Sequence, residues 1–329
     1  PLELRETPPA ERVRLLDRYG RPFAQLYLRN RESVPLHRVA RVMRQATVAV
    51  EDARFYRHAG LDVKGTLRAL AVNLTSGGIR QGGSSLTQQL VKNMLLEQAE
   101  SEAEQDRARA PTLRRKIAEL RHALALERKY TKDQILERYL NIAYFGAGVF
   151  GVQAAAQRFF GVDAAELTLP QAATLAGALR TPYATDPTVG AAQRRRLLER
   201  RNLVLRRMSE LGMISAAEAH RARRLPLGLR LTPAPGGCAA SAHPYFCRYV
   251  HAELLANPVF GHTPDERRRR LAQGGLVLRT SLDPVAQRAA ERAIAARVHP
   301  QDTEVAAEAM VEPGTGLIRA LAASKRYGP

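Results

Sequence analysis

The sequence predicts a mainly α-helical domain, followed by a linker and by the beginning of a smaller α+β domain. Apolar residues recur at helical spacing between Leu36 and Leu225, and this stretch contains no convincing strand pattern. Residues 226–275 are interrupted by proline and glycine and include a run of four arginines, which indicates a linker. From residue 276 onward, strand-like and helix-like segments follow one another, as is typical of an α+β domain.

Residues 1–35 are predicted to lead into the helical domain and to contain a β-hairpin. Its strands lie within Val13–Tyr27, and Arg18–Arg21 supplies the turn between them. The helical domain is predicted over residues 36–225. One face of its first helix carries four apolar residues at helical spacing: Val39, Val42, Met43 and Ala46.

Several helix ends are marked by capping residues. Three capping boxes pair a serine or threonine with a glutamine or glutamate three residues later: Thr131 with Gln134, Thr168 with Gln171, and Ser215 with Glu218. Glycines stand at two expected C-terminal caps, Gly161 and Gly212. These signals predict roughly seven to nine helices before residue 225.

Residues 276–329 are predicted to begin a second domain. Leu276–Thr280 has the pattern of a strand, and Asp283 precedes a helix that extends to about Val298. Two further strand patterns flank the turn Pro313–Gly316, which indicates another hairpin.

Composition restricts the classes of partner. The chain has 329 residues with 45% apolar residues, so it is globular and long enough for two domains. Its 51 Lys and Arg against 32 acidic residues give a net charge of +19, which predicts an anionic partner such as nucleic acid, an anionic bilayer or a phosphorylated substrate. Trp is absent and aromatic residues make up 5%, which argues against a nucleic-acid-binding module.

The two cysteines and the two ends of the chain give information about the cellular location of the protein. Cys238 and Cys247 do not have the spacing of a zinc site; they would form a disulfide in an extracytoplasmic protein and stay free thiols in the cytosol. No run of about 18 apolar residues is present. Because the chain starts at Pro1 and stops at Pro329 within a strand pattern, we expect a fragment that lacks an N-terminal anchor.

Glu51–Gly60 combines adjacent carboxylates, an aromatic residue, a histidine and a glycine at the end of an apolar run. A carboxylate in that position is partly desolvated, and desolvation raises its pKa toward the range of a general base. The alternative is an ordinary acid at a helix end. His58 would be a base or, as we favour, a partner in a hydrogen-bond network.

Gln81–Gln89 is a glycine- and hydroxyl-rich segment that opens a helix. Exposed N–H groups at its glycines, and the hydroxyls of Ser84, Ser85 and Thr87, suit it to holding an anion. Lys92, one turn later, adds a positive charge.

A third block begins an amphipathic helix on which Arg115 and Lys116 can both reach Glu119. The alternative to a functional cluster is a surface ion pair, worth about 0.3–0.5 kcal/mol. We expect four apolar residues of this helix to face the interior: Leu113, Ile117, Leu120 and Leu124. A fourth block, Lys132–Asn141, ends with an asparagine that is a candidate polar group near a helix end.

These four blocks, in this order, resemble glycosyltransferase family 51, the peptidoglycan polymerase domain of class A penicillin-binding proteins and monofunctional transglycosylases. The first motif is matched in full at Glu51–Gly60, the third at Arg115–Glu119 and the fourth at Lys132–Asn141. The second is matched at Gly82–Gln89, where Ser85 and Leu86 are conservative departures.

A fifth block is looser. Gln171 stands where an acid is usual, and Thr185 stands near the usual tyrosine within Pro182–Pro187. The resemblance covers about residues 10–225.

Thr280–Gln287 and Met310–Gly316 look like the junction to a penicillin-binding transpeptidase domain and its first hairpin. The nucleophile motif of that domain, Ser-x-x-Lys, would lie beyond Pro329, so we expect no acylation by penicillin.

The resemblance implies a lysozyme-like fold of two helical lobes around a cleft. It implies polymerisation of lipid II into β-1,4 glycan strands, with inversion and release of undecaprenyl pyrophosphate. Glu51 would be the general base, and Glu119 would orient cations, metal or substrate. A lysozyme-like lytic hydrolase is the alternative; it needs a protonated acid at the glycosidic oxygen, and the cationic cluster argues against it.

The residues expected to bind substrate are Asp52, Phe55, His58, Arg68, Gln81, Gly83, Ser84, Thr87, Gln88, Gln89, Lys92, Arg115, Lys116 and Asn141. A divalent cation, magnesium or manganese, is expected to assist, without assigned ligands. Expected partners are lipid II, the nascent glycan strand, the anionic membrane surface and proteins of a cell-wall synthesis complex, but not nucleic acid. The expected location is the extracytoplasmic face of the bacterial cell membrane. Four apolar residues would dip into lipid or, alternatively, belong to a helix core: Leu90, Met94, Leu95 and Leu96.

Overall fold

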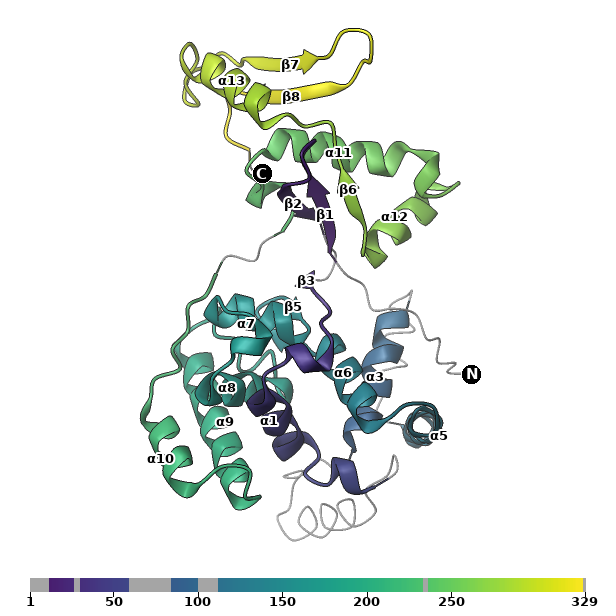
Figure 1. Ribbon diagram of the computed structural model, residues 1–329, viewed down its shortest axis with the longest axis vertical. Coiled ribbons are helices and arrows are strands. Elements are labelled where there is room, and N and C mark those ends of the chain that lie inside the picture. The colour runs from purple at the N-terminus through teal and green to yellow at the C-terminus, as the bar shows by residue number, and fades with distance from the viewer. Residues whose placement is uncertain (1–11, 27–29, 59–83, 100–111, 233–235, 328–329) are drawn as a thin grey trace. The chain divides into compact units, whose positions relative to one another are not determined.

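The computed structural model describes residues 12–26, 30–58, 84–99, 112–232 and 236–327. They form two compact units (Figure 1). The helical unit lies within Glu32–Pro233; the second unit combines Ala10–Arg31 with Ala234–Pro329. Helices dominate the described residues, so the predicted mainly α-helical class is confirmed.

The helical unit follows the sequence closely. Its α-helices are α1 (Arg41–Glu51), α3 (Leu86–Gln98), α5 (Leu113–Lys129), α6 (Lys132–Ile142), α7 (Val152–Phe160), α8 (Leu169–Leu179), α9 (Ala191–Glu210) and α10 (Ala216–Arg224). Short 3₁₀ helices are η1 (Leu36–Arg38), η2 (Phe55–Arg57) and η3 (Ala164–Glu166). The capping boxes at Thr131, Thr168 and Ser215 are present.

The helical unit also contains a small hairpin that the sequence pattern did not reveal. β4 (Tyr144–Gly146) pairs antiparallel with β5 (Val149–Phe150). Strands of two or three residues are too short for an alternating pattern, so the expectation of no strand in 36–225 was wrong.

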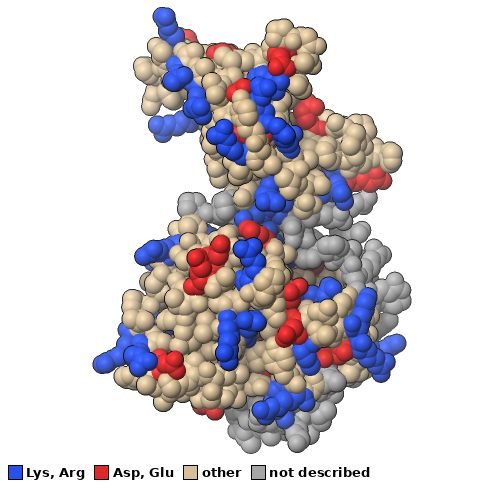
Figure 2. Space-filling view, in the orientation of Figure 1, with Lys and Arg blue, Asp and Glu red and all other residues tan. Residues whose placement is uncertain are grey.

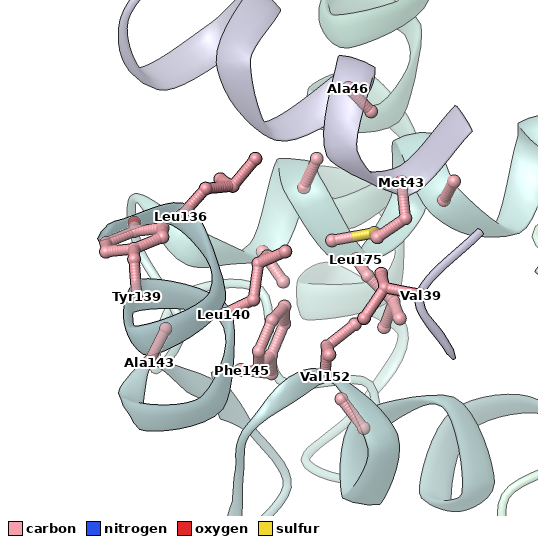
Figure 3. Close-up of a cluster of buried hydrophobic side chains, with 14 of the residues drawn as sticks. Val39, Met43, Ala46, Leu136, Tyr139, Leu140, Ala143, Phe145, Val152 and Leu175 are labelled. Carbon is pink, nitrogen blue, oxygen red and sulfur yellow. The ribbon is translucent and has the colours of Figure 1, made fainter. Parts of the chain in front are cut away.

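The core of the helical unit forms where α1, α8 and α9 pack together and where α3 packs against α5 and α6. Met43 of α1, Leu140 of α6 and Leu175 of α8 are fully buried and point into the same interior (Figure 3). Leu90, Met94 and Leu95 of α3 also belong to this core, and Leu96 is partly buried against it. The helix-core alternative for these four residues is therefore the correct one.

Two of the four apolar residues of α5 that were predicted to face the interior are exposed. Ile117 is 52% exposed and Leu124 is 36% exposed, while Arg115 and Glu119 are buried. The prediction that Ile117 and Leu124 face the interior was wrong. Burial of the charged pair is tolerated because the two groups neutralise each other beside α3.

The second unit joins the two ends of the sequence in one sheet. β1 (Val13–Leu16) pairs antiparallel with β2 (Pro22–Leu26) and parallel with β6 (Val277–Arg279). The predicted hairpin exists, but it is part of the second unit rather than a lead-in to the helical domain. Parallel pairing across more than 250 residues leaves no local signal in the sequence. β3 (Asn30–Arg31) follows β2 along the chain.

Residues 226–275, predicted as a linker, contain regular structure: η4 (Cys238–Ala240), α11 (Pro244–Ala256), η5 (Pro258–Phe260) and α12 (Pro264–Gln273). Pro244 and Pro264 begin α11 and α12, because proline fits the first helical turn. A disulfide joins Cys238 to Cys247, which settles the alternative left open by the sequence. Both cysteines lie in a small core with Val13 and Leu15.

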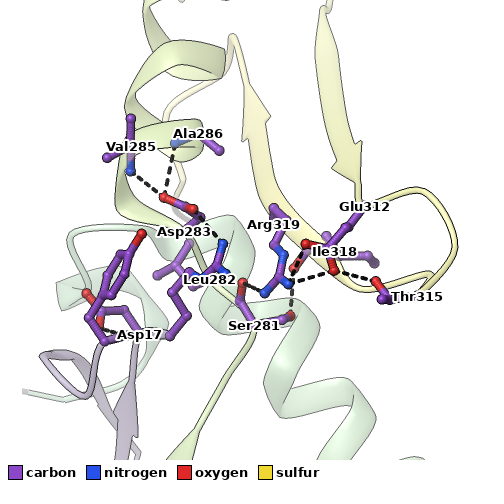
Figure 4. A network of polar contacts seen from close by, with 12 residues as sticks. Asp17, Ser281, Leu282, Asp283, Val285, Ala286, Glu312, Thr315, Ile318 and Arg319 are labelled. Carbon is purple, nitrogen blue, oxygen red and sulfur yellow. Dashed lines mark hydrogen bonds and ion pairs between the residues drawn. The ribbon is translucent and has the colours of Figure 1, made fainter.

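The remaining elements agree with the prediction: α13 (Pro284–Ala295) packs on the hairpin of β7 (Ala307–Val311) and β8 (Ile318–Ala323). A polar network holds them (Figure 4). Asp283 accepts hydrogen bonds from the N–H groups of Val285 and Ala286, and from Nη1 of Arg18 at 2.9 Å. Although burial opposes it, these bonds lower the pKa of Asp283. Arg319 pairs with Glu312 at 2.7 Å.

Positive charge is spread over the face of the molecule seen in Figure 2. Figure 2 shows Lys and Arg side chains distributed over both units in the visible face, not gathered in a single patch. Within the described ranges, every helix is too short or too polar to cross a bilayer.

Arg201 is a fully buried arginine of α9 that closes the C-terminal end of α10. Its Nη1 donates to the Leu225 carbonyl at 2.7 Å, and its Nη2 donates to the Arg223 carbonyl at 3.0 Å. We predict that Arg201→Ala lowers the free energy of unfolding by about 2–4 kcal/mol, because the packing of the buried side chain is lost and these carbonyls lose their donors. Urea unfolding followed by circular dichroism measures the change.

The control is Arg206→Ala, an exposed arginine of the same helix. Its effect should stay within about 0.5 kcal/mol. Equal losses for the two variants would show that the buried guanidinium contributes no more than a surface arginine.

Candidate active site

Three helices meet at Glu51, the last residue of α1. Nε2 of Gln89, in the first turns of α3, donates to Glu51 Oε2 at 2.7 Å. The hydroxyl of Tyr139, on α6, donates to Gln89 Oε1 at 3.3 Å. This chain of bonds fixes the position of one carboxylate oxygen.

The other oxygen, Oε1, is buried and has no hydrogen-bond partner among the described residues. Burial raises the pKa of Glu51, and the charge of Asp52 adds to the increase. The bond from Gln89 and the positive charges of Arg180 and Arg200 act in the opposite direction. Glu51 is therefore a carboxylate with enhanced basicity and one unused lone-pair site, as a general base requires.

Asp52 has a different environment from its neighbour. It is buried and accepts a hydrogen bond from Nε2 of His58 at 2.9 Å and one from the N–H of Leu86 at 3.0 Å. Asp52 thus ties η2 to the start of α3. The favoured interpretation of His58, a partner in a hydrogen-bond network, agrees with this contact. Phe55 is fully buried, and Nζ of Lys132 lies 4.5 Å from its ring centroid.

A cationic cluster reaches the same end of α3 from α5. Nζ of Lys116 donates to Ser84 Oγ at 2.8 Å and lies 3.1 Å from Glu119 Oε2. Arg115 Nη1 pairs with the other oxygen of Glu119. Glu119 is 1% exposed, whereas the Lys116 side chain is 47% exposed. The buried carboxylate holds two cations, and Lys116 remains accessible to an anionic ligand.

The beginning of α3 therefore contacts both the carboxylates at the end of α1 and the cationic cluster of α5. Ser84 contacts the cationic cluster, Leu86 contacts Asp52 and Gln89 contacts Glu51. The positive end of the α3 dipole points into this region. Ser85 and Gln88 form the capping box that begins the helix, so Gln88 has a structural role here.

Two predicted substrate-binding side chains are engaged in structural contacts instead. Thr87 is fully buried and donates to Glu127, which also pairs with Lys132 at 2.8 Å. Asn141 bonds the backbone of Val34 through both side-chain groups, at 2.9 and 3.0 Å.

Lys92 is exposed on α3. Three other predicted binding residues lie outside the described residues: Arg68, Gln81 and Gly83.

Sequence reasoning missed Arg180 and Arg200, the two arginines whose charges act on Glu51. Arg180 is exposed directly after α8, and Arg200 lies on α9, which packs against α1. Burial and the charge of Arg180 lower the pKa of Arg200, while Glu51 raises it. Helical spacing could have revealed this region, because Leu197, Val204 and Met208 define a buried face of α9 in the arginine-rich stretch.

The described side chains do not fit a protein-held metal ion. Among them, no group of three or more His, Cys, Asp or Glu side chains comes together. Both oxygens of Glu119 are paired with cations, and Asp52 is engaged by His58 and Leu86. The expected divalent cation therefore stays a prediction.

Residues 19–209 match the family model described as Transglycosylase. The chain is 35% identical over 278 residues to penicillin-binding protein 1F of Bacillus subtilis, covering 84% of this chain and 36% of that protein. It is 36% identical over 317 residues to penicillin-binding protein 1B of Vibrio cholerae, covering 93% and 37%. A putative transglycosylase of Cupriavidus necator is 39% identical over 197 residues, covering 60% of this chain and 79% of that protein. The chain thus spans little more than a third of the penicillin-binding proteins it resembles.

Burial of Glu51 predicts a measurable effect on stability. Because its folded-state pKa is raised above the ordinary glutamate value of 4.5, its stabilising contribution is complete below that value and is lost as the pH rises through the folded pKa. We predict that Glu51→Gln raises the free energy of unfolding near neutral pH by about 0.5–2 kcal/mol. Thermal unfolding at about pH 4 and about pH 7.5 tests this, since the advantage of the variant should grow with pH.

Glu210→Gln, an exposed acid on α9, serves as the control and should leave the melting temperature almost unchanged. A destabilised Glu51→Gln variant at neutral pH would contradict the assignment of a desolvated carboxylate.

Proposed function

Since this chain belongs to the transglycosylase family, we propose that it is a peptidoglycan glycosyltransferase that polymerises lipid II into β-1,4 glycan strands and releases undecaprenyl pyrophosphate. The observation that carries the proposal is the meeting of a basic carboxylate and accessible positive charge at the start of α3. The reaction needs both: a base for the attacking hydroxyl and cations for a diphosphate leaving group.

In the proposed step, the carboxylate of Glu51 accepts the proton of the sugar 4-hydroxyl. The oxygen attacks the anomeric carbon of the growing strand, and the bond from that carbon to the pyrophosphate oxygen breaks. The electron pair of this bond leaves with the pyrophosphate, whose charge is balanced by Lys116. A single displacement of this kind inverts the α-linked donor to a β product.

Gln89 and Tyr139 hold the base in one orientation, and Arg180 and Arg200 favour its charged form. Ser84 and Glu119 hold Lys116 near the N-terminal end of α3. Lys116 is the cation that meets the substrate most directly, since Arg115 is buried beneath it.

The hydrogen bonds and ion pairs of Asp52 and Glu119 argue against a lytic hydrolase. Hydrolysis of a glycosidic bond normally uses a pair of acidic side chains, one of them protonated. Asp52 is engaged by His58 and Leu86, and Glu119 is engaged by Arg115 and Lys116. Among the described residues, Glu51 alone combines a raised pKa with an unpaired oxygen at this site.

We further propose that the exposed side of α5 contacts the anionic membrane that holds the substrate. Ile117 and Leu124 are exposed on this helix, and the exposed Arg121, Arg128 and Lys129 accompany them. An apolar stripe with flanking cations is typical of helices that lie at a lipid surface. The buried pair of Arg115 and Glu119 is on the opposite side, so the site would lie about one helix diameter, ~10 Å, from the headgroups.

This proposal places the protein at the extracytoplasmic face of the bacterial cell membrane, with lipid II and the nascent strand as substrates. The disulfide between Cys238 and Cys247 is consistent with an oxidising compartment. Proteins of a cell-wall synthesis complex remain predicted partners. A magnesium or manganese ion would act through the pyrophosphate, since magnesium is usually bound with substrate phosphates.

The proposed base is tested with labelled lipid II and a gel that separates glycan strands. Glu51→Gln should lower the rate of polymerisation by at least about 10²-fold, because the attacking hydroxyl keeps its proton. In the unmodified protein, the acid limb of kcat/KM should lie above the ordinary range of a glutamate, because burial raises the pKa of Glu51. Glu210→Gln is the matched control and should retain the rate. Near-normal polymerisation by Glu51→Gln would refute the proposed role, and shortening of glycan would favour the hydrolase.

The membrane contact is tested by flotation with vesicles that contain anionic lipid. Ile117→Asn combined with Leu124→Asn should reduce the bound fraction several-fold, because the apolar stripe is lost. Leu211→Asn, another partly exposed leucine of the helical unit, should bind like the unmodified protein. Equal binding by all three proteins would exclude α5 as the contact.

A further inference from the structure

Three aromatic residues form a cluster on the helical unit that the proposed reaction does not use. Tyr144 of β4 lies between Phe150 of β5 and Tyr183 of the loop after α8, with ring centroids 4.7 and 5.3 Å away. Tyr183 is 75% exposed, whereas Tyr144 and Phe150 are partly buried. We call these three residues the aromatic platform.

The loop that carries Tyr183 is held firmly against β4. A Cβ at Gly146 would lie 2.8 Å from the Pro182 carbonyl oxygen, so only glycine permits this approach. The N–H of Ala147 donates to Asp186 Oδ2 at 2.8 Å. Nε of Arg194, on α9, donates to the Pro187 carbonyl at 2.8 Å. The ring of Tyr183 is therefore presented by a structured loop.

The loop of the platform begins beside a residue whose charge acts on the proposed active site. Arg180, three residues before Tyr183, is exposed, and its charge acts on Glu51. The resemblance placed a tyrosine near position 185, but Thr185 is buried there and its hydroxyl bonds to the Thr181 carbonyl. The exposed tyrosine of this loop is instead Tyr183.

The chemistry of the platform suits an uncharged, hydroxyl-rich ring. The charged side chains beside Tyr183 are engaged with the backbone of the loop: Asp186 accepts hydrogen bonds from the N–H groups of Ala147 and Thr188, and Arg194 donates to the Pro187 carbonyl. An exposed tyrosine combines an apolar face with a hydroxyl at its edge. A pyranose likewise has an apolar C–H face and hydroxyls around its rim.

We propose that Tyr183, supported by Tyr144, stacks against a sugar ring of the glycan strand and holds the strand beside the active site. This inference rests on the proposed function for the identity of the glycan. Stacking on one tyrosine tolerates either sugar of the repeat, because it uses the ring face and not a particular substituent.

The first experiment measures binding without catalysis. Chitotetraose, an uncharged β-1,4 oligosaccharide, is titrated into the full chain and followed by calorimetry. Tyr183→Ala should weaken its binding about fivefold, and Tyr183→Phe should weaken it less because the ring is kept. Val189→Ala, at another exposed apolar residue of the same loop, should bind like the unmodified protein. Unchanged binding by Tyr183→Ala, with circular dichroism showing a folded protein, would overturn the proposal.

The second experiment uses labelled lipid II. Tyr183→Ala should produce a shorter distribution of strands than Val189→Ala, since a growing strand held less tightly dissociates earlier. If the unmodified protein makes no strands, the proposed function fails, while oligosaccharide binding tests the platform independently. If Tyr183→Ala loses binding to anionic vesicles but keeps binding to chitotetraose, the platform is a lipid contact and the proposal is wrong.

Discussion

The first turns of α3 are the constraint on which the candidate site depends. Within six residues, this segment binds Lys116 through Ser84, Asp52 through the N–H of Leu86 and Glu51 through Gln89. These contacts join the start of α3 to α5 and to the end of α1. The capping box of Ser85 and Gln88 sets where the helix begins, and so sets which N–H and side-chain groups face these partners.

The acidic side chains of the site have similar chemistry but different surroundings. Glu51 is desolvated and keeps one oxygen unpaired, while Asp52, its direct neighbour, accepts hydrogen bonds from His58 and Leu86. Glu119 is buried but compensated by Arg115 and Lys116. Each arrangement has a different consequence: basicity at Glu51, rigidity at Asp52 and a fixed cationic surface at Lys116.

The strand pairing of the second unit makes the helical unit an insertion within its sequence. Because β1 pairs with β6, the whole helical unit lies, in sequence, between two neighbouring strands of one sheet. Parallel pairing requires a long connection, and here that connection is an entire folded unit. The disulfide joining η4 to α11 and the hydrogen bonds around Asp283 stabilise the unit that receives both ends of this connection.

The sequence by itself determined the local elements and the identity of the motifs. The capping residues at Thr131 and Ser215, the hairpin at Val13–Leu26 and the block beginning at Glu51 depend on interactions between near neighbours, and such signals survive in a linear pattern. Tertiary structure alone decided that α5 turns Arg115 inward and Ile117 outward, that the range predicted as a linker contains α11 and α12, and that Arg180 and Arg200 act on Glu51. These outcomes depend on the elements that pack against each side chain, because residues far apart in the sequence decide which face of a helix is covered and which charges lie near one another.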